Sequence, residues 1–214
     1  MPEKLYFELP TDKWNAEIPE NSPLNYEIEA ALYKWNSDTA VIIIVGKWWT
    51  TEWYENKYVT IANNLVKDHW VNVFVIENPW ISWDDPELFF DSAMKFVIDK
   101  MKEFWYDNPK FYMMWYSAGW HFTWRFSYKY PEIKKLLLVN AVLSVDFEKL
   151  KKWLLTFQWD ITIVQWDKDV DFFFHPLLNQ ITNANIITLP WVNHIFSNEW
   201  WLEMFIWLAE KYLF

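Results

Sequence analysis

Short apolar segments alternate with longer amphipathic segments over most of this chain. The uncharged runs Ala40–Val45, Val71–Ile76 and Phe111–Tyr116 predict strands that are buried on both faces. Between the first two, Glu55–Asp68 carries apolar residues at the spacing of one helix face. A second helix is predicted from Asp84 to about Trp105, because proline lies in its first turn and acids lie near its positive end.

The same alternation continues to the C-terminus. Ala118–Tyr130 predicts a helix that ends before Pro131. Further strands are predicted at Lys135–Val139, Ile161–Gln165 and Asn185–Leu189, and further helices at Asp146–Thr156, Phe172–Ile181 and Ser197–Leu213, with Ser197 as an N-cap. Before residue 40, the pattern predicts an edge strand, Leu5–Leu9, a loop, and a second strand, Tyr26–Tyr33.

This order of elements predicts an α/β fold with a mostly parallel central sheet and helices on both faces. The length of 214 residues fits one domain, in which residues 1–39 supply N-terminal strands and a loop, and residues 40–214 form the core. The predicted strand that ends at Val139 leads to a single helix near Asp146 without a long insertion. We therefore expect no large cap domain.

Charge and composition exclude several classes of protein. The net charge of −10 argues against nucleic acid and anionic membrane surfaces as partners. The absence of cysteine excludes disulfides, thiolate zinc sites and cysteine nucleophiles. The N-terminal sequence lacks the profile of a signal peptide, and no apolar run approaches the roughly 20 residues of a membrane span. We expect a soluble cytoplasmic protein; its oligomeric state is left open.

The glycine and tryptophan counts are abnormal. Average usage of about 7% predicts roughly 15 glycines at this length, whereas the chain has 2 glycines and 19 tryptophans. Several tryptophans occupy predicted turns that favour glycine, namely Trp48, Trp49, Trp70, Trp166 and Trp191. One hypothesis is that most of them stand for glycine in the biological protein, for example because the source organism reads UGA codons as glycine. The alternative is that the tryptophans are literal, from engineering or drift.

Residues with catalytic chemistry follow the predicted strands. The carboxyl ends of parallel strands meet at one edge of a sheet, and Gly46, Ser117, Asp167, Asp169 and His194 all follow such ends. Acyl transfer needs a nucleophile, an imidazole that takes its proton, a carboxylate that orients the imidazole, and two N–H donors for the oxyanion. These groups are present here in the chain order serine, aspartate, histidine.

Ser117 lies between a predicted strand and a predicted helix, as the serine of a nucleophile elbow does. The run from Trp115 to Gly119 matches the elbow pattern small-x-Ser-x-small except at its first position, where tryptophan replaces the expected small residue. An indole there is expected to enter the turn. The simpler alternative is that Ser117 is the N-cap of the following helix.

From about Ala40 onward, the chain resembles small α/β-hydrolases, in which the catalytic residues occur in the order Ser117, Asp169, His194. The resemblance implies that Ser117 is the nucleophile, His194 the general base and Asp169 the acid that orients it. The family's Gly-x-x-Asp motif is matched by the run from Trp166 to Asp169. Asp167 is then a turn residue and the second candidate for the acid.

The other histidines lack the family's position between the last strand and the C-terminal helix. His69 ends a predicted helix, His121 lies early in the predicted elbow helix, and His175 lies in an aromatic run that could line the pocket. No two histidines have the helical spacing of metal ligands, so no metal site is expected. The resemblance implies no cofactor.

The family's oxyanion loop, His-Gly-x-Gly-Gly, aligns with the run from Val45 to Trp49. This alignment implies that the backbone N–H groups of Lys47 and Ala118 are the oxyanion donors. The tryptophans of the loop would crowd the oxyanion hole. A residue forced into a conformation suited only to glycine costs about 1–3 kcal/mol, against net stabilities of about 5–15 kcal/mol.

The sequence therefore predicts a serine hydrolase that acts on a small-molecule acyl substrate with an ester-like bond, through an acyl-enzyme. A carboxylester or a thioester fits, and the sequence does not separate these from peptidase or acyltransferase chemistry. If the tryptophans are literal, the alternative is a catalytically inactive α/β-hydrolase-fold protein that binds a ligand or partner.

Overall fold

The computed structural model describes residues 2–10, 25–46, 53–78, 85–117, 126–140, 147–168, 175–181, 183–190 and 201–214. In chain order its elements are β1 (Glu3–Pro10), β2 (Asn25–Tyr33), β3 (Thr39–Ile44), α1 (Trp53–His69), β4 (Asn72–Ile76), α2 (Pro86–Glu103), β5 (Lys110–Tyr116), the 3₁₀ helix η4 (Ser127–Lys129), β6 (Ile133–Val139), α4 (Phe147–Thr156), β7 (Asp160–Trp166), α5 (His175–Leu178), β8 (Ala184–Leu189) and α6 (Trp201–Leu213).

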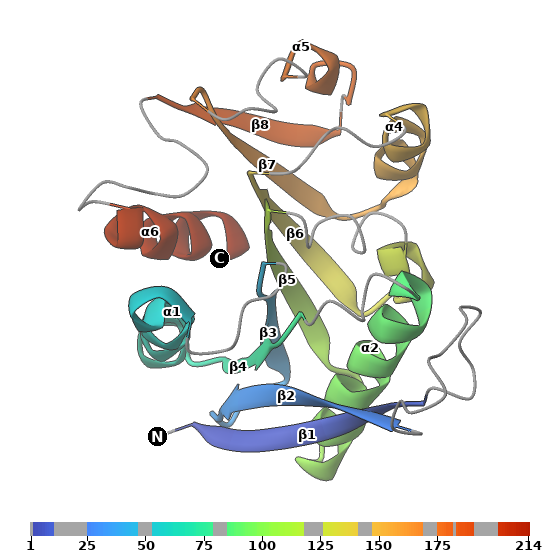
Figure 1. The fold of residues 1–214 in the computed structure, drawn as a ribbon, viewed down its shortest axis with the longest axis vertical. Coiled ribbons are helices and arrows are strands. Elements are labelled where there is room, and N and C mark those ends of the chain that lie inside the picture. Colours follow the sequence, from blue (N-terminus) through green and yellow to red (C-terminus); the bar gives the residue numbers. More distant parts are fainter. Residues whose placement is uncertain are drawn as a thin grey trace.

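All eight strands form one sheet in the order β1-β2-β4-β3-β5-β6-β7-β8 (Figure 1). The pairs β1–β2 and β2–β4 are antiparallel. Every later pair, from β3–β4 to β7–β8, is parallel. The predicted α/β fold with a mostly parallel sheet is confirmed. Between β6 and β7, where no large cap domain was expected, the described residues form the helix α4.

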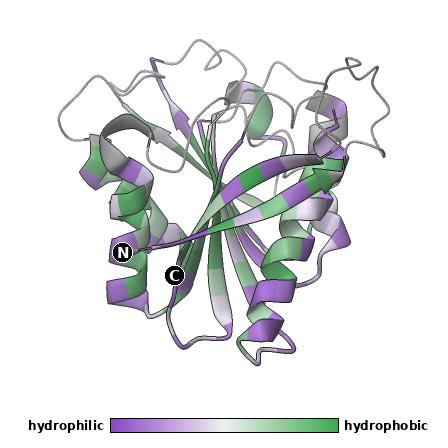
Figure 2. Ribbon diagram, turned by 60° about the horizontal axis from the view of Figure 1, so that its bottom comes forward, coloured by the Kyte–Doolittle hydropathy of each residue, from purple (hydrophilic) through white to green (hydrophobic). Residues whose placement is uncertain are grey.

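Helices cover both faces of this sheet (Figure 1). Alternate residues of β3 enter two different cores: Ile42 and Ile44 pack with residues of α2, α4 and α5, whereas Val41 and Ile43 pack with residues of α1 and α6. A strand buried on both faces has no polar side, which explains the uncharged runs in the sequence. Figure 2 shows the hydrophobic residues along the central strands and on the helix faces turned toward them.

The helix α2 is capped at both ends. The side chain of Asp85 accepts a hydrogen bond from the N–H of Leu88 at 3.0 Å, and Pro86 occupies the first turn. At the other end, the N–H of Trp105 donates to the carbonyl of Lys102 at 2.8 Å, and the N–H of Tyr106 donates to that of Met101 at 3.1 Å. These two bonds form a Schellman motif.

A tryptophan in the left-handed conformation lies just beyond the C-terminal end of each of the helices α1 and α2. Trp105 has a φ of 71°, and Trp70 has a φ of 55°. The N–H of Trp70 donates to the carbonyl of Val66 at 3.1 Å, which is the simpler αL cap. The sequence predicted a left-handed cap at Trp70, whereas Trp105, predicted as the approximate end of the helix, lies two residues beyond Glu103, the last residue of α2. Helices favour glycine at both positions, because glycine has no Cβ.

Other predicted boundaries need correction. The helix predicted at Phe172–Ile181 ends at Leu178 in α5, because the N–H groups of Gln180 and Ile181 donate to carbonyls three residues back and form tight turns; its predicted first residues, 172–174, lie outside the described residues. The end of the predicted elbow helix is the 3₁₀ helix η4, and its earlier residues, 118–125, lie outside the described residues. The predicted N-cap Ser197 also lies outside them. Within the described ranges, no helix combines the length and the hydropathy that a membrane span requires.

The left-handed tryptophans provide a test of backbone strain. Replacing Trp105 with glycine removes the steric penalty of a positive φ, and the side chain is 92% exposed, so little packing is lost. We expect Trp105→Gly to raise the free energy of unfolding by about 1 kcal/mol, measured by urea denaturation.

The matched control is Trp207→Gly, in the interior of α6, where the side chain is 42% exposed. Glycine there is expected to lower the free energy of unfolding by about 1 kcal/mol or more. A loss of stability in both variants would contradict the strain at Trp105.

Candidate active site

Ser117 follows the last residue of β5 and has a φ of 56°. Its side chain is mostly buried, with 8% of the residue exposed. A serine in the left-handed region is strained, and such strain persists where the surrounding structure holds the residue in place. The backbone at Ser117 therefore makes the sharp turn that the sequence predicted at this position.

The two residues before Ser117 anchor it to opposite cores. The ring of Trp115 stacks on that of Phe90 of α2, with centroids 6.1 Å apart. The ring of Tyr116 meets that of Phe205 of α6 edge-on at 5.3 Å. Both residues are at most 1% exposed. The indole of Trp115 thus lies in the core beneath the turn, and the expectation that it would enter the turn is wrong.

The strand register places Ser117 beside the end of β3. Ile44 pairs with Trp115 in the parallel ladder, so Gly46 and Ser117 each lie two residues beyond the same pair. On the other side, Tyr116 pairs with Val139 of β6, and Asn140 follows with a φ of 52°. The chain after β3, β5 and β6 therefore leaves the sheet at one common edge.

Hydrogen bonds fix the backbone at the start of the predicted oxyanion loop. The N–H of Val45 donates to the carbonyl of Ile76 at 3.2 Å. The amide nitrogen of Asn78 donates to the carbonyl of Val45 at 3.1 Å, and the N–H of Gly46 donates to the hydroxyl of Tyr58 at 3.4 Å. The N–H and the carbonyl of Val45 and the N–H of Gly46 are therefore all hydrogen-bonded just before Lys47.

The end of β7 is also fixed at this edge. The N–H of Asp167, the second candidate for the acid, donates to the carbonyl of Leu189 at the end of β8, at 3.1 Å. The preceding Trp166 is fully buried, and its ring lies 6.3 Å from that of Phe205. The loop after β7 therefore starts from a well-anchored position.

Of the predicted site residues, Ser117 is described. Lys47, Ala118, Asp169 and His194 lie outside the described residues. Among the competing histidines, His69 stacks on the ring of Phe214 at 3.9 Å, at the end of α1 away from Ser117. His121 lies outside the described residues, and His175 begins α5. The ring of His69 therefore makes a packing contact with the last residue of the chain.

Sequence analysis missed a buried lysine next to the turn. Lys57 of α1 is 1% exposed, and its ammonium lies 4.4 Å from the centroid of the Tyr116 ring. Burial lowers the pKa of Lys57 to about 7. A lysine beside the apolar positions of an amphipathic helix is an ordinary sequence pattern, so only the packing of α1 against β5 and α6 reveals it.

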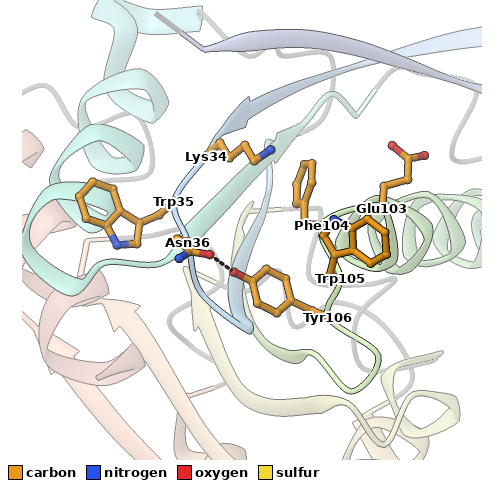
Figure 3. A pocket seen from close by; sticks show the side chains of 7 residues that line it. All are labelled: Lys34, Trp35, Asn36, Glu103, Phe104, Trp105 and Tyr106. Carbon is orange, nitrogen blue, oxygen red and sulfur yellow. Dashed lines mark hydrogen bonds between the residues drawn. The ribbon is translucent and has the colours of Figure 1, made fainter.

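A cavity of about 540 Å³ lies away from Ser117, between the segment after β2 and the end of α2 (Figure 3). Lys34, Trp35, Asn36, Glu103, Phe104, Trp105 and Tyr106 line it. The hydroxyl of Tyr106 donates to the side-chain oxygen of Asn36 at 2.6 Å. These residues precede β3 and β5, so the cavity is at the amino-terminal ends of the strands, away from Ser117.

Comparison by sequence finds no matching family model and no matching curated protein. Comparison of structures finds many similar proteins. The esterase Pf2001 of Pyrococcus furiosus has a TM-score of 0.70 and 11% identity, over 100% of this chain and 93% of that one. A thioesterase domain from the curacin biosynthetic pathway has a TM-score of 0.67 and 10% identity, over 99% of both chains.

An alpha/beta serine hydrolase homologue from Coxiella burnetii is also similar, with a TM-score of 0.65 and 15% identity, over 86% of this chain and 91% of that one. Identities this low show a shared architecture and nothing finer. The similarity nevertheless extends over nearly the whole length of both chains, and this protein has the α/β-hydrolase fold.

Proposed function

We propose that this protein is a serine hydrolase that cleaves carboxylester or thioester bonds with Ser117 as its nucleophile. The observation that carries the proposal is the φ of 56° at Ser117, directly after the central strand β5. A serine that merely caps a helix takes an extended backbone. The left-handed conformation instead fits an elbow that holds the hydroxyl above the sheet edge.

The proposed mechanism follows from this placement. The hydroxyl of Ser117 attacks the carbonyl carbon while His194 takes its proton, and Asp169 stays ionised and orients the imidazole. The N–H groups of Lys47 and Ala118 stabilise the negative charge on the tetrahedral intermediate. His194 then protonates the leaving group, and water releases the acyl group from Ser117 by the reverse sequence of steps.

The substrate class follows from the similar structures and from the described surroundings of Ser117. The similar structures include an esterase and a thioesterase domain, which supports an ester or a thioester as the substrate. In the described residues, β6 leads to β7 through the ten-residue helix α4, so nothing there forms a large cap over Ser117. A site of this kind suits small or flexible acyl groups.

Removing the nucleophile tests the proposal directly. We expect Ser117→Ala to lower kcat/KM for p-nitrophenyl acetate by at least about 1,000-fold, because Ser117 carries the acyl group in the proposed mechanism. The same variant should lose labelling by a fluorophosphonate probe. Ser92→Ala, on the helix α2, is the matched control and should retain both the ester turnover and the labelling by the probe. Equal turnover by the wild type and Ser117→Ala would overturn the proposal.

Substrate class can be tested with a matched pair of acyl donors. The same acetyl group is offered as p-nitrophenyl acetate and as a short-chain acetyl thioester, and kcat/KM is compared. Turnover of both donors, each lost in Ser117→Ala, supports the proposed acyl-enzyme mechanism. Turnover of a peptide amide in preference to both would instead assign the site to a peptidase.

A second experiment asks which residues the native protein carries near Ser117, and whether its Ser117 is reactive. Trp70 and Trp105 take the left-handed conformation that favours glycine, which supports the hypothesis that such positions carry glycine in the biological protein. Protein from the native source should therefore be treated with the fluorophosphonate probe and digested with trypsin. We expect the peptide that spans residues 111–125 to carry the probe and to have the lower mass of glycine at positions 115, 120 and 124.

Each result of this experiment is decisive. A labelled peptide that retains its tryptophans would refute the glycine hypothesis and would support the proposed hydrolase function. An unlabelled peptide that retains them would overturn the enzyme and favour the alternative, a catalytically inactive protein that binds a ligand or partner.

A further inference from the structure

Two buried side chains hold the backbone at the end of β3 from outside the sheet. Asn78 donates to the carbonyl of Val45 at 3.1 Å, and Tyr58 accepts from the N–H of Gly46 at 3.4 Å. Both side chains are fully buried. Interior hydrogen bonds of this kind are costly to lose, because the partner group is left without water. They therefore fix the peptide unit between Val45 and Gly46, where the chain leaves the sheet.

The held position matters for the residue that follows. The carbonyl of Val45 and the N–H of Gly46 belong to one planar peptide unit, so Asn78 and Tyr58 hold the two sides of the same unit. This unit is the fixed point from which the chain continues to Lys47. In the proposed mechanism the N–H of Lys47 is an oxyanion donor, and donors must be aimed before the reaction begins.

Lys57, the neighbour of Tyr58 on α1, links the same helix to the serine. Its ammonium lies 4.4 Å from the ring centroid of Tyr116, 4.7 Å from that of Tyr58 and 5.4 Å from that of Phe205. A cation is attracted to the faces of aromatic rings, most strongly away from water. Lys57 thus connects α1, β5 and α6 at the residue that directly precedes Ser117.

We propose that Tyr58 and Lys57 are positioning residues of the proposed site. The hydroxyl of Tyr58 sets the oxyanion loop through Gly46, and the ammonium of Lys57 sets the nucleophile through the ring of Tyr116. The inference rests on the proposed function for its chemistry. The positions themselves can be tested without any substrate.

The two residues differ in how they respond to pH. Burial raises the pKa of the Tyr58 phenol, so this hydroxyl remains neutral. Burial lowers the pKa of Lys57 from 10.5 to about 7. Among the described residues, the titratable groups whose rings lie near the ammonium include Tyr58 from α1 and Tyr116 from β5, and α6 contributes the ring of Phe205. Above about pH 7, Lys57 is neutral and its attraction to these rings is lost.

Although the attraction to the rings is lost above about pH 7, the free energy of unfolding rises with pH. Between about pH 7 and 10.5 the unfolded chain binds a proton at Lys57 that the folded protein does not. Stability therefore rises with pH through this window, and the charged lysine is destabilising below it. Lys57→Met is expected to raise the Tm at pH 6 and to change it little above pH 10. A Tm difference that stays the same from pH 6 to above pH 10 would show that Lys57 does not titrate in this window.

The sequence supplies a direct reporter of position. Its 2 glycines, Gly46 and Gly119, give only two backbone amide signals in protein labelled with ¹⁵N-glycine. We expect Tyr58→Phe to displace the Gly46 signal, since its N–H loses its acceptor. In the wild type the Gly46 signal should move with a midpoint near pH 7, and in Lys57→Met this movement should be absent.

Tyr112→Phe, which removes a hydroxyl from the opposite end of β5, is the matched control and should leave both glycine signals in place. An unchanged Gly46 signal in Tyr58→Phe would overturn the role of Tyr58. A wild-type movement that persists in Lys57→Met would overturn the role of Lys57.

Kinetics complete the test. Tyr58→Phe should lower kcat for p-nitrophenyl acetate about tenfold and leave KM within about twofold. A displaced donor loses more of its stabilisation of the transition state than of the bound substrate. Lys57→Met should lower kcat about tenfold at pH 6 and hardly at all at pH 9, where the wild-type lysine is already neutral. A constant loss at all pH values would identify packing alone and overturn the role of the charge. If the protein has no esterase activity and the native protein is not labelled by the fluorophosphonate probe, the proposed function fails, and the glycine signals still decide the positioning.

Discussion

The parallel pairing of β3 with β5 is the constraint on which the rest of the site depends. This register places Ile44 opposite Trp115, so that the chain leaves both strands at the same level. Gly46 and Ser117 then lie side by side at the edge of the sheet. Because side chains alternate along a strand, a slip of one residue would exchange the two cores and turn Trp115 toward α6. Position at the edge and packing of the cores are therefore set by the same hydrogen bonds.

The two cores contribute unequally to this edge. On one side, α2 provides Phe90, a purely apolar neighbour of Trp115. On the other side, α1 brings the polar ends of Lys57 and Tyr58 into the interior. Buried polar groups are retained where they fix a geometry that apolar packing would leave less defined. In this fold such groups lie next to the chain segments that enter the proposed site.

Much of the fold follows from the sequence, because burial on both faces leaves a plain signal. The strands β3, β4 and β5 contain no polar side, and their predicted limits agree with the structure to within a residue or two. Helix ends were harder to predict. The Schellman motif at Trp105 uses a residue that has no preference for it, so the sequence could not place the end of α2. A hydroxyl that accepts from a backbone N–H twelve residues earlier, as in Tyr58, has no local pattern at all.

The cavity at the opposite end of the molecule depends on the same unusual composition. Trp35 and Trp105 form part of its lining, and Trp105 takes a conformation suited to glycine. If glycine occupies these two positions in the native protein, two indole walls are absent and the hollow opens to solvent. A small molecule found there in a fragment screen on recombinant material would then report on the expression host's genetic code and would not identify a natural ligand.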